Sequence, residues 1–201
     1  MSIDAVPDAP GMSTRQRIAC LVAWRLMVRY DPALGAHSEV VGRAALRLAS
    51  PARAAEWYWA GRLHDFGKLG LPRVFWNTPR LFTDRERAQA RIHPVVGARV
   101  LHWLGAPPAI IEGAYYHHER WNGTGYPHDI GQHTIPLIGR ALAIADVWGA
   151  ITQDRPYRAA MPDPTARAFL ERYAGSLFDP TLVARFLASP EPSDGNFYTR
   201  V

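Results

Sequence analysis

Residues Tyr115–Pro127, with the sequence YYHHERWNGTGYP, carry the densest group of chemically active side chains in this 201-residue chain. Two adjacent histidines, His117 and His118, are followed by an acid, an arginine and a glycine-rich turn. Neutral imidazole is a common metal ligand, and neighbouring residues of a helix point about 100° apart. Such a pair can serve two ions or approach a cluster from its flank. Whether this segment is a polar helix end or one wall of a metal site depends on ligands elsewhere.

Further candidate ligands occur singly in or beside apolar helical stretches. They are His37, His64, Asp65, His93 and Asp146. Taken one at a time, each has an ordinary interpretation as a capping residue, a helix end or a satisfied buried acid. Together they would be polar groups within apolar helices, where burial without partners is costly. A metal centre would satisfy all of them at once.

The types of these ligands restrict the ion. Imidazole and carboxylate without thiolate favour iron, manganese or zinc over a cysteine-rich structural zinc site. Seven candidate ligands are too many for one ion, so they predict two ions bridged by a carboxylate and a hydroxide. Lys68 follows Asp65 by three residues, on the same face if that helix continues. Because a lysine there would repel a cation but attract a phosphate, the pairing predicts phosphoryl chemistry.

Helical periodicity covers most of the chain, and no segment shows sustained strand alternation. Thr83 and Glu86 have the spacing of a capping box, and prolines 107, 108 and 136 stand where helices begin. The predicted helices span about 13–30, 37–49, 52–66, 83–104, 107 into HHER, 136–152, 163–175 and 180–188. The pattern predicts an all-α fold, a helical bundle whose core holds a site between facing helices. We expect a disordered lead over 1–11, a single domain over 12–188 and a tail over 189–201.

Composition narrows the possible classes of protein. The 48% hydrophobic content is normal for a globular core. No apolar run approaches the length of a membrane span, and the N-terminus lacks the pattern of a secretory signal, so we expect a cytoplasmic protein without membrane association. The net charge of +5 suits an anionic ligand, but the arginines are scattered, so we expect no nucleic-acid partner. The single cysteine, Cys20, lies in an apolar stretch and is expected to be a buried, inert thiol.

The motifs resemble those of a known family. HDFGK (64–68) resembles the HDxGK signature, and HHERWNGTGYP (117–127) resembles the HHExxxGxGYP signature, of the HD-GYP branch of the HD superfamily. The order of the pieces also fits over about residues 36–188: HSE, HD, HP, HHE, GYP and then AIADVWGAITQDRPYR. The resemblance implies an HD-type helical bundle with a metal site in its core. It also implies a bacterial phosphodiesterase that hydrolyses cyclic di-GMP to the linear dinucleotide, to GMP, or to both.

The resemblance assigns roles to residues by motif position. The implied metal ligands are His37, His64, Asp65, His93, His117, His118 and Asp146. Asp65 would bridge the ions, and Lys68 would contact the scissile phosphate. Tyr126 would line the substrate groove, and Arg155 and Arg158 match positions that contact the phosphates of the dinucleotide. The implied cofactor is a pair of divalent ions, iron or alternatively manganese, that holds a hydroxide at neutral pH.

Three departures from the family pattern change the expectation. Members with a third ion carry a glutamate where this chain has Ala33, so we predict a two-ion site. Gly149 replaces the second acid of ADVxDA, which is not a ligand position, so we expect altered bonding around the ligands without loss of metal. TPRLFT (78–83) stands where relatives often have KPGKLT, which removes a lysine near the groove.

Other functions remain open on the sequence alone. The chain could hydrolyse a different cyclic nucleotide or phosphate ester, or it could be a signalling module that binds nucleotide without turnover. The helix before residue 36 is too short for a sensory domain. We therefore expect regulation by substrate level, by self-association, or by a partner such as a diguanylate-cyclase-type or other signalling protein. Residues 57–59 (WYW) cannot all face one way on a helix, which suggests an exposed aromatic at a partner surface.

Overall fold

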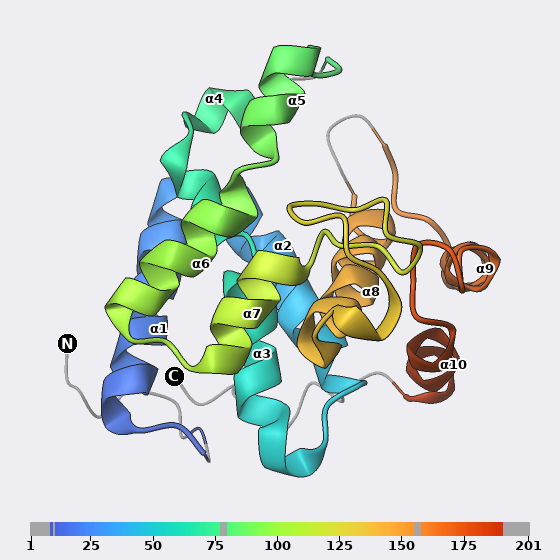
Figure 1. The fold of residues 1–201 in the computed structure, drawn as a ribbon, viewed down its shortest axis with the longest axis horizontal. Helices are drawn as coiled ribbons and strands as arrows, with labels where there is room; N and C mark the ends of the chain where they lie inside the picture. The colour runs from blue at the N-terminus through green and yellow to red at the C-terminus, as the bar shows by residue number, and fades with distance from the viewer. Residues whose placement is uncertain (1–8, 10, 77–79, 155–157, 191–201) are drawn as a thin grey trace.

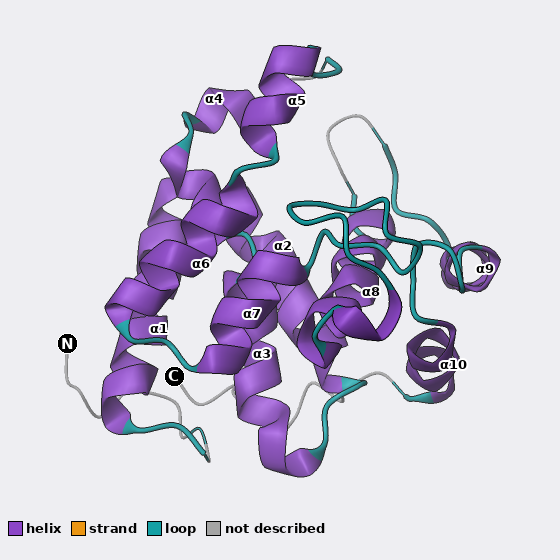
Figure 2. Ribbon diagram, in the orientation of Figure 1, coloured by secondary structure: helices purple, strands orange, loops and turns teal. Residues whose placement is uncertain are grey.

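The structure is a computed structural model that describes residues 9, 11–76, 80–154 and 158–190, and every regular element in these residues is helical (Figures 1 and 2). The α-helices are α1 (Thr14–Tyr30), α2 (Pro32–Leu46), α3 (Ala54–Leu63), α4 (Arg73–Trp76), α5 (Asp84–Ala90), α6 (His93–Leu104), α7 (Pro108–Tyr116), α8 (Leu137–Thr152), α9 (Asp163–Arg172) and α10 (Pro180–Ala188). Short 3-10 helices are η2 (Pro51–Arg53), η3 (Phe66–Gly70) and η4 (Gln132–Thr134). The predicted all-α class is confirmed.

Helix α3 is the central element of the bundle, packed against α2, α7 and α8 (Figure 1). Trp57, Tyr58 and Trp59 are all buried, with 3%, 5% and 1% of their surfaces exposed. The expectation of an exposed aromatic in this run is therefore wrong. A helix enclosed on all sides can bury consecutive aromatics, whereas the expectation assumed that one face meets water.

Three predicted helix boundaries are also wrong, and all three errors concern the site. The helix expected over 37–49 is α2, which begins at Pro32 and ends at Leu46, so His37 lies inside the helix and not at its start. The helix expected over 83–104 is two helices, α5 and α6, separated at Arg91 and Ile92. Pro94 lies in the first turn of α6, where its missing N–H costs nothing, but in the middle of a longer helix it would remove a hydrogen bond. The helix expected over 52–66 ends at Leu63, and η3 follows it from Phe66. These breaks place His64, Asp65 and His93 at helix ends.

Other expectations from the sequence are confirmed locally. Thr83 and Glu86 form the predicted capping box of α5. Cys20 is fully buried, and burial raises the pKa of its thiol to about 12. Of the predicted lead, only Ala9 and Gly11 are described, and Ala9 is buried. Most of the predicted tail lies outside the described residues. Within the described part of the chain, none of the helices combines the length and apolar character needed to cross a bilayer.

Candidate metal centre

Three buried histidines are held in the same way by the carbonyl three residues before them. The Nδ1 atoms lie 2.7 Å from Gly61 O for His64, 2.7 Å from Ala90 O for His93, and 2.9 Å from Ala114 O for His117. Because a carbonyl can only accept, each Nδ1 carries the proton in the neutral ring, and each Nε2 presents a lone pair. This tautomer is the one in which Nε2 can bind a metal ion.

The Nε2 atoms of these histidines converge on the carboxylate of Asp65. Its Oδ2 lies 3.1 Å from His64 Nε2, and its Oδ1 lies 3.2 Å from His93 Nε2 and 3.7 Å from His117 Nε2. Ligand atoms about 2 Å from a shared ion lie about 3 Å apart. The two oxygens of Asp65 therefore face two different groups of candidate ligands.

One group lies on α2, α3 and α8. His37 Nε2 is 2.9 Å from Asp146 Oδ1, which is also 3.6 Å from His64 Nε2. The other nitrogen of His37 lies 3.2 Å from Gln153 Oε1 at the end of α8, a partner that the sequence analysis missed. Candidate donor atoms of His37, His64 and Asp65 all lie within 4.8 Å of one another.

Two facing glycines allow α2 and α3 to approach closely enough to form this first group. A Cβ atom on Gly61 would lie 2.6 Å from the Cα atom of Gly42. The crossing brings the rings of His37 and His64 to a centroid separation of 5.7 Å. Gly149, the predicted departure from ADVxDA, lies at the α8 side, where an added Cβ would be 3.5 Å from His37 Cε1. The contact with His37 would be an ordinary one, and the tighter contact of an added Cβ would be with Val41 Cγ2 on α2, at 3.2 Å.

The other group comprises Asp65, His93, His117 and His118, whose candidate donor atoms again lie within 4.8 Å of one another. The ring of Tyr126 stacks on His118, with centroids 4.6 Å apart and planes at 26°. This stacking contact places the GYP turn against His118. Asp65 belongs to both groups, and His117 and His118 contribute to one group only.

Burial and charge set the protonation of these groups. Burial lowers the pKa of His117 to about 4, and burial followed by the charges of His117 and His93 lowers that of His118 well below its usual value. Burial also disfavours charge on His64, but Asp65 and Asp146 outweigh it and raise the pKa of His64 to about 10. In the metal-free chain a proton therefore occupies the position at His64 Nε2 that a cation would take.

The arrangement fits divalent cations. His93 Nε2 and His117 Nε2 lie 3.3 Å apart, and their lone pairs face each other because both Nδ1 atoms donate to carbonyls. Asp65 Oδ1 is buried, and it makes no hydrogen bond within the described residues. Buried acceptors without donors are costly unless a cation satisfies them. The set of imidazoles and carboxylates without thiolate suits iron, manganese or zinc.

A sequence profile of the HD domain matches residues 25–182, which is most of the chain. The chain belongs to the HD domain family. A cyclic di-GMP phosphodiesterase of Vibrio cholerae is 38% identical over 151 residues, 72% of this chain and 31% of that protein. A 3'3'-cGAMP-specific phosphodiesterase of the same organism is 34% identical over 125 residues, 62% of this chain and 27% of that protein. The chain therefore spans less than a third of the length of these two relatives.

A solved structure of an HDG"Y"P protein from Bdellovibrio bacteriovorus shares the HD domain fold. It superposes with a TM-score of 0.61 at 17% identity, covering 86% of this chain and 60% of that one. At this identity the likeness concerns the fold alone. The family match and the relatives named as cyclic di-GMP phosphodiesterases confirm the resemblance to the HD-GYP branch that the motifs HDFGK and HHERWNGTGYP indicated.

The predicted substrate residues of this HD domain have different surroundings. Lys68 Nζ lies 2.5 Å from Asp65 Oδ2, because residues three apart eclipse in the 3-10 helix η3. The indole of Trp76 lies beside Lys68, and its Nε1 donates to Lys68 O at 3.0 Å. The sequence analysis missed this contact. Arg158 donates to Ala150 O at 2.5 Å. Arg155 lies outside the described residues.

Glu119, which the sequence analysis assigned no role, anchors the GYP loop of the HD domain. Its side chain is buried, and its Oε1 accepts the backbone N–H of His128 at 2.7 Å. Gly123, with φ +78°, and Gly125, whose added Cβ would lie 2.5 Å from Arg120 N, form the turn between them. Both glycines therefore serve the geometry of the turn. The acid that follows the two histidines of HHER could have indicated this role. Only the fold shows that it accepts a hydrogen bond from the backbone N–H of His128.

We expect Glu119→Ala to loosen the loop without removing the ligands. A buried acceptor bonded to a backbone N–H contributes about 1–3 kcal/mol, so the free energy of unfolding should fall by about that amount. Amide hydrogen exchange over residues 126–130 should rise several-fold. Glu112→Ala, at an exposed position of α7, is the matched control and should change neither quantity. Unchanged exchange in Glu119→Ala would contradict the anchoring role.

Proposed function

We propose that this HD domain is a metal-dependent phosphodiesterase that hydrolyses cyclic di-GMP. The observation that carries the proposal is the position of Asp65, whose two oxygens face two separate groups of candidate ligands. Two ions that share a carboxylate are the arrangement used for in-line displacement at phosphorus. The names of the relatives support the choice of a cyclic dinucleotide as the substrate.

The proposed ligands follow from the two groups. His37, His64 and Asp146 would hold one ion, His93, His117 and His118 would hold the other, and Asp65 would bridge them. When bound, divalent ions supply an activated water nucleophile and stabilise charge on the phosphoryl oxygens. We propose two ions, since Ala33 replaces the acid of three-ion members, and iron as the metal, with manganese as the alternative.

The remaining side chains would bind and orient the substrate. Lys68, held over Asp65, would donate to a non-bridging oxygen of the scissile phosphate and offset the charge that develops there. Tyr126, fixed by its stack on His118, would present its outer face to the groove. Trp76 would shield the Lys68 side from water. Contacts of Arg155 and Arg158 with phosphate stay part of the proposal.

The test is an anaerobic assay of cyclic di-GMP cleavage with iron-loaded, manganese-loaded and metal-stripped protein, with metal content measured on the same samples. Cleavage that rises with metal content to about two ions per chain would support the proposal. Bound metal without cleavage of any cyclic dinucleotide would overturn it in favour of another phosphate ester or a silent signalling module. Failure to bind metal would overturn the ligand assignment.

A second candidate substrate is 3'3'-cGAMP, because one of the relatives is named for that specificity. Parallel measurement of kcat/KM for both cyclic dinucleotides decides between them. A cytoplasmic location, a single domain over 12–188 and regulation by a diguanylate-cyclase-type or other signalling protein stay predictions.

A further inference from the structure

Two arginines without an assigned role flank the second ligand group. Arg91 precedes His93 by two residues, in the break between α5 and α6, and Arg120 follows His118 by two residues, at the start of the GYP loop. Both side chains are exposed. The break that separates α5 from α6 therefore places a cation directly beside a candidate ligand.

Arg91 makes a cation–π contact with Tyr126. Its guanidinium carbon lies 4.9 Å from the centroid of the Tyr126 ring, whose stacking partner is His118. A guanidinium that lies over a ring keeps its N–H groups in its own plane, where they remain available as paired donors. The contact therefore holds the guanidinium near Tyr126 without using the donors that would bind an oxyanion.

Arg120 lies within electrostatic reach of the same tyrosine. Burial, together with the charges of Asp65 and Asp146, raises the pKa of the Tyr126 hydroxyl, and the charges of Arg91 and Arg120 oppose that rise. Among the described residues, the Arg120 guanidinium donates to the Thr124 hydroxyl at 3.5 Å.

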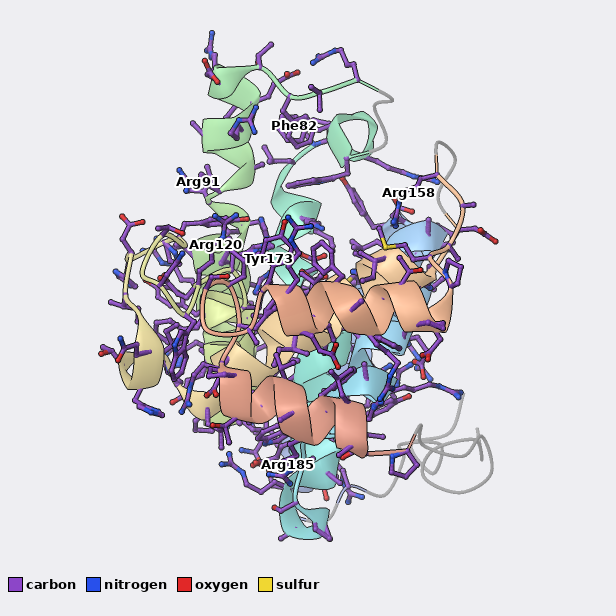
Figure 3. All side chains as sticks on the ribbon, turned by 90° about the vertical axis from the view of Figure 1, so that its right-hand side faces the viewer. Phe82, Arg91, Arg120, Arg158, Tyr173 and Arg185 are labelled. Carbon is purple, nitrogen blue, oxygen red and sulfur yellow. The ribbon has the colours of Figure 1, made fainter. Side chains whose placement is uncertain are left out.

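Neither arginine forms an ion pair with a carboxylate of the described residues. Exposed guanidinium groups without a carboxylate partner attract anions. Arg158 differs, because it donates to the carbonyl of Ala150 and lies well apart from Arg91 and Arg120 in Figure 3. Lys68 also differs, because it donates to Asp65, the residue shared by the two ligand groups. The chain thus presents a separate pair of cations at the Tyr126 side of the site.

We propose that Arg91 and Arg120 form an anion subsite that holds the non-scissile phosphate of a cyclic dinucleotide. The inference rests on the proposed function, in which the scissile phosphate lies at Asp65 and Lys68. A cyclic dinucleotide carries its two phosphodiester groups in one ring, so the second lies at a fixed distance from the first. Bidentate donors at the rim would select substrates with a second phosphate over simple phosphodiesters.

The test measures binding without turnover. The dissociation constant of cyclic di-GMP is determined by equilibrium dialysis of the full chain in the presence of chelator. We expect Arg91→Ala and Arg120→Ala each to raise it about tenfold, the usual effect of losing a charge-assisted hydrogen bond. Arg99→Ala, at an exposed position farther along α6, is the matched control and should not change it. Each alanine variant should also show a weaker dependence of binding on salt than the parent chain.

The outcomes separate this inference from the proposed function. If the parent chain binds the ligand and the affinity falls only in Arg91→Ala and Arg120→Ala, the subsite is supported. Absence of cleavage by metal-loaded protein would then overturn the proposed function alone. If affinity is unchanged in both variants, or falls equally in Arg99→Ala, the subsite is overturned even where metal-loaded protein cleaves the substrate. A parent chain that neither binds nor cleaves the ligand overturns both.

A final control addresses folding. Loss of Arg91 removes a contact of Tyr126, so thermal unfolding is measured for each variant. If Arg91→Ala proves unstable, the result for Arg120→Ala decides, since the Arg120 side chain is exposed and makes one weak contact with the residues that the structure describes. Arg120→Lys should recover part of the affinity, because it restores the charge without the bidentate donors.

Discussion

Asp65→Asn should remove both ions and lower kcat/KM for cyclic di-GMP by about a thousandfold or more. The reason lies in the two oxygens of Asp65, which face His64 on one side and His93 and His117 on the other. An amide keeps one acceptor and turns an NH₂ group toward the remaining position, where it would repel a cation. Other ligands serve one group each, so single substitutions there should lose less metal.

Metal content and activity are measured together for this variant. We expect about two ions per chain in the parent and fewer than one in Asp65→Asn. The matched control is Asp129→Asn, an exposed acid of the GYP loop whose φ of +54° asparagine adopts readily. Retention of both ions by Asp65→Asn would show that Asp65 does not bridge, and the two groups would need another shared ligand.

The sequence allows the ligand set to be predicted because the family motifs carry it in order. HDFGK and HHERWNGTGYP contain four of the seven proposed ligands, and the structure brings all seven candidate side chains into two adjoining groups. What the motifs could not predict is how the rings are held. The Nδ1 atom of His37 bonds to Gln153, more than a hundred residues away, and such a contact depends on how α2 packs on α8.

The fold class was predictable from periodicity, but the breaks that matter to the site were not. Helical spacing continues through residues 91 and 92, and only Pro94 signals that a new helix begins. Burial of Trp57, Tyr58 and Trp59 likewise depends on helices that surround α3 from distant parts of the chain. The spacing of apolar residues describes one helix at a time. The break between α5 and α6 and the burial of the aromatic run depend on contacts between helices, which override that spacing.

Gly67→Ala is expected to disrupt the metal centre without replacing a ligand. Gly67, the glycine of HDFGK, lies in η3 against the first turns of α6. A Cβ atom there would lie 1.9 Å from the carbonyl oxygen of His93 and 2.6 Å from the backbone nitrogen of Gly97. Both are backbone atoms, so no side-chain rotation relieves the clash, and η3 must separate from α6.

That separation acts directly on the ligands at both ends of the contact. Asp65 immediately precedes η3 and His93 begins α6, and their ligand atoms are 3.2 Å apart. A displacement of about 1 Å should weaken metal binding about a hundredfold, the usual effect of misplacing groups that must meet at a fixed geometry. Overpacking between backbones should also lower the free energy of unfolding by about 3 kcal/mol.

Gly70→Ala provides a matched control in the same 3-10 helix. Its added Cβ would meet only Val96 Cγ1, at an ordinary distance of 3.5 Å, so stability and metal content should stay close to those of the parent. Thermal unfolding of the metal-free chain and metal content after loading are measured for both variants. Equal behaviour of Gly67→Ala and Gly70→Ala would contradict this account. A stable Gly67→Ala that still loses its ions would show that the glycine positions the ligands rather than merely permitting the fold.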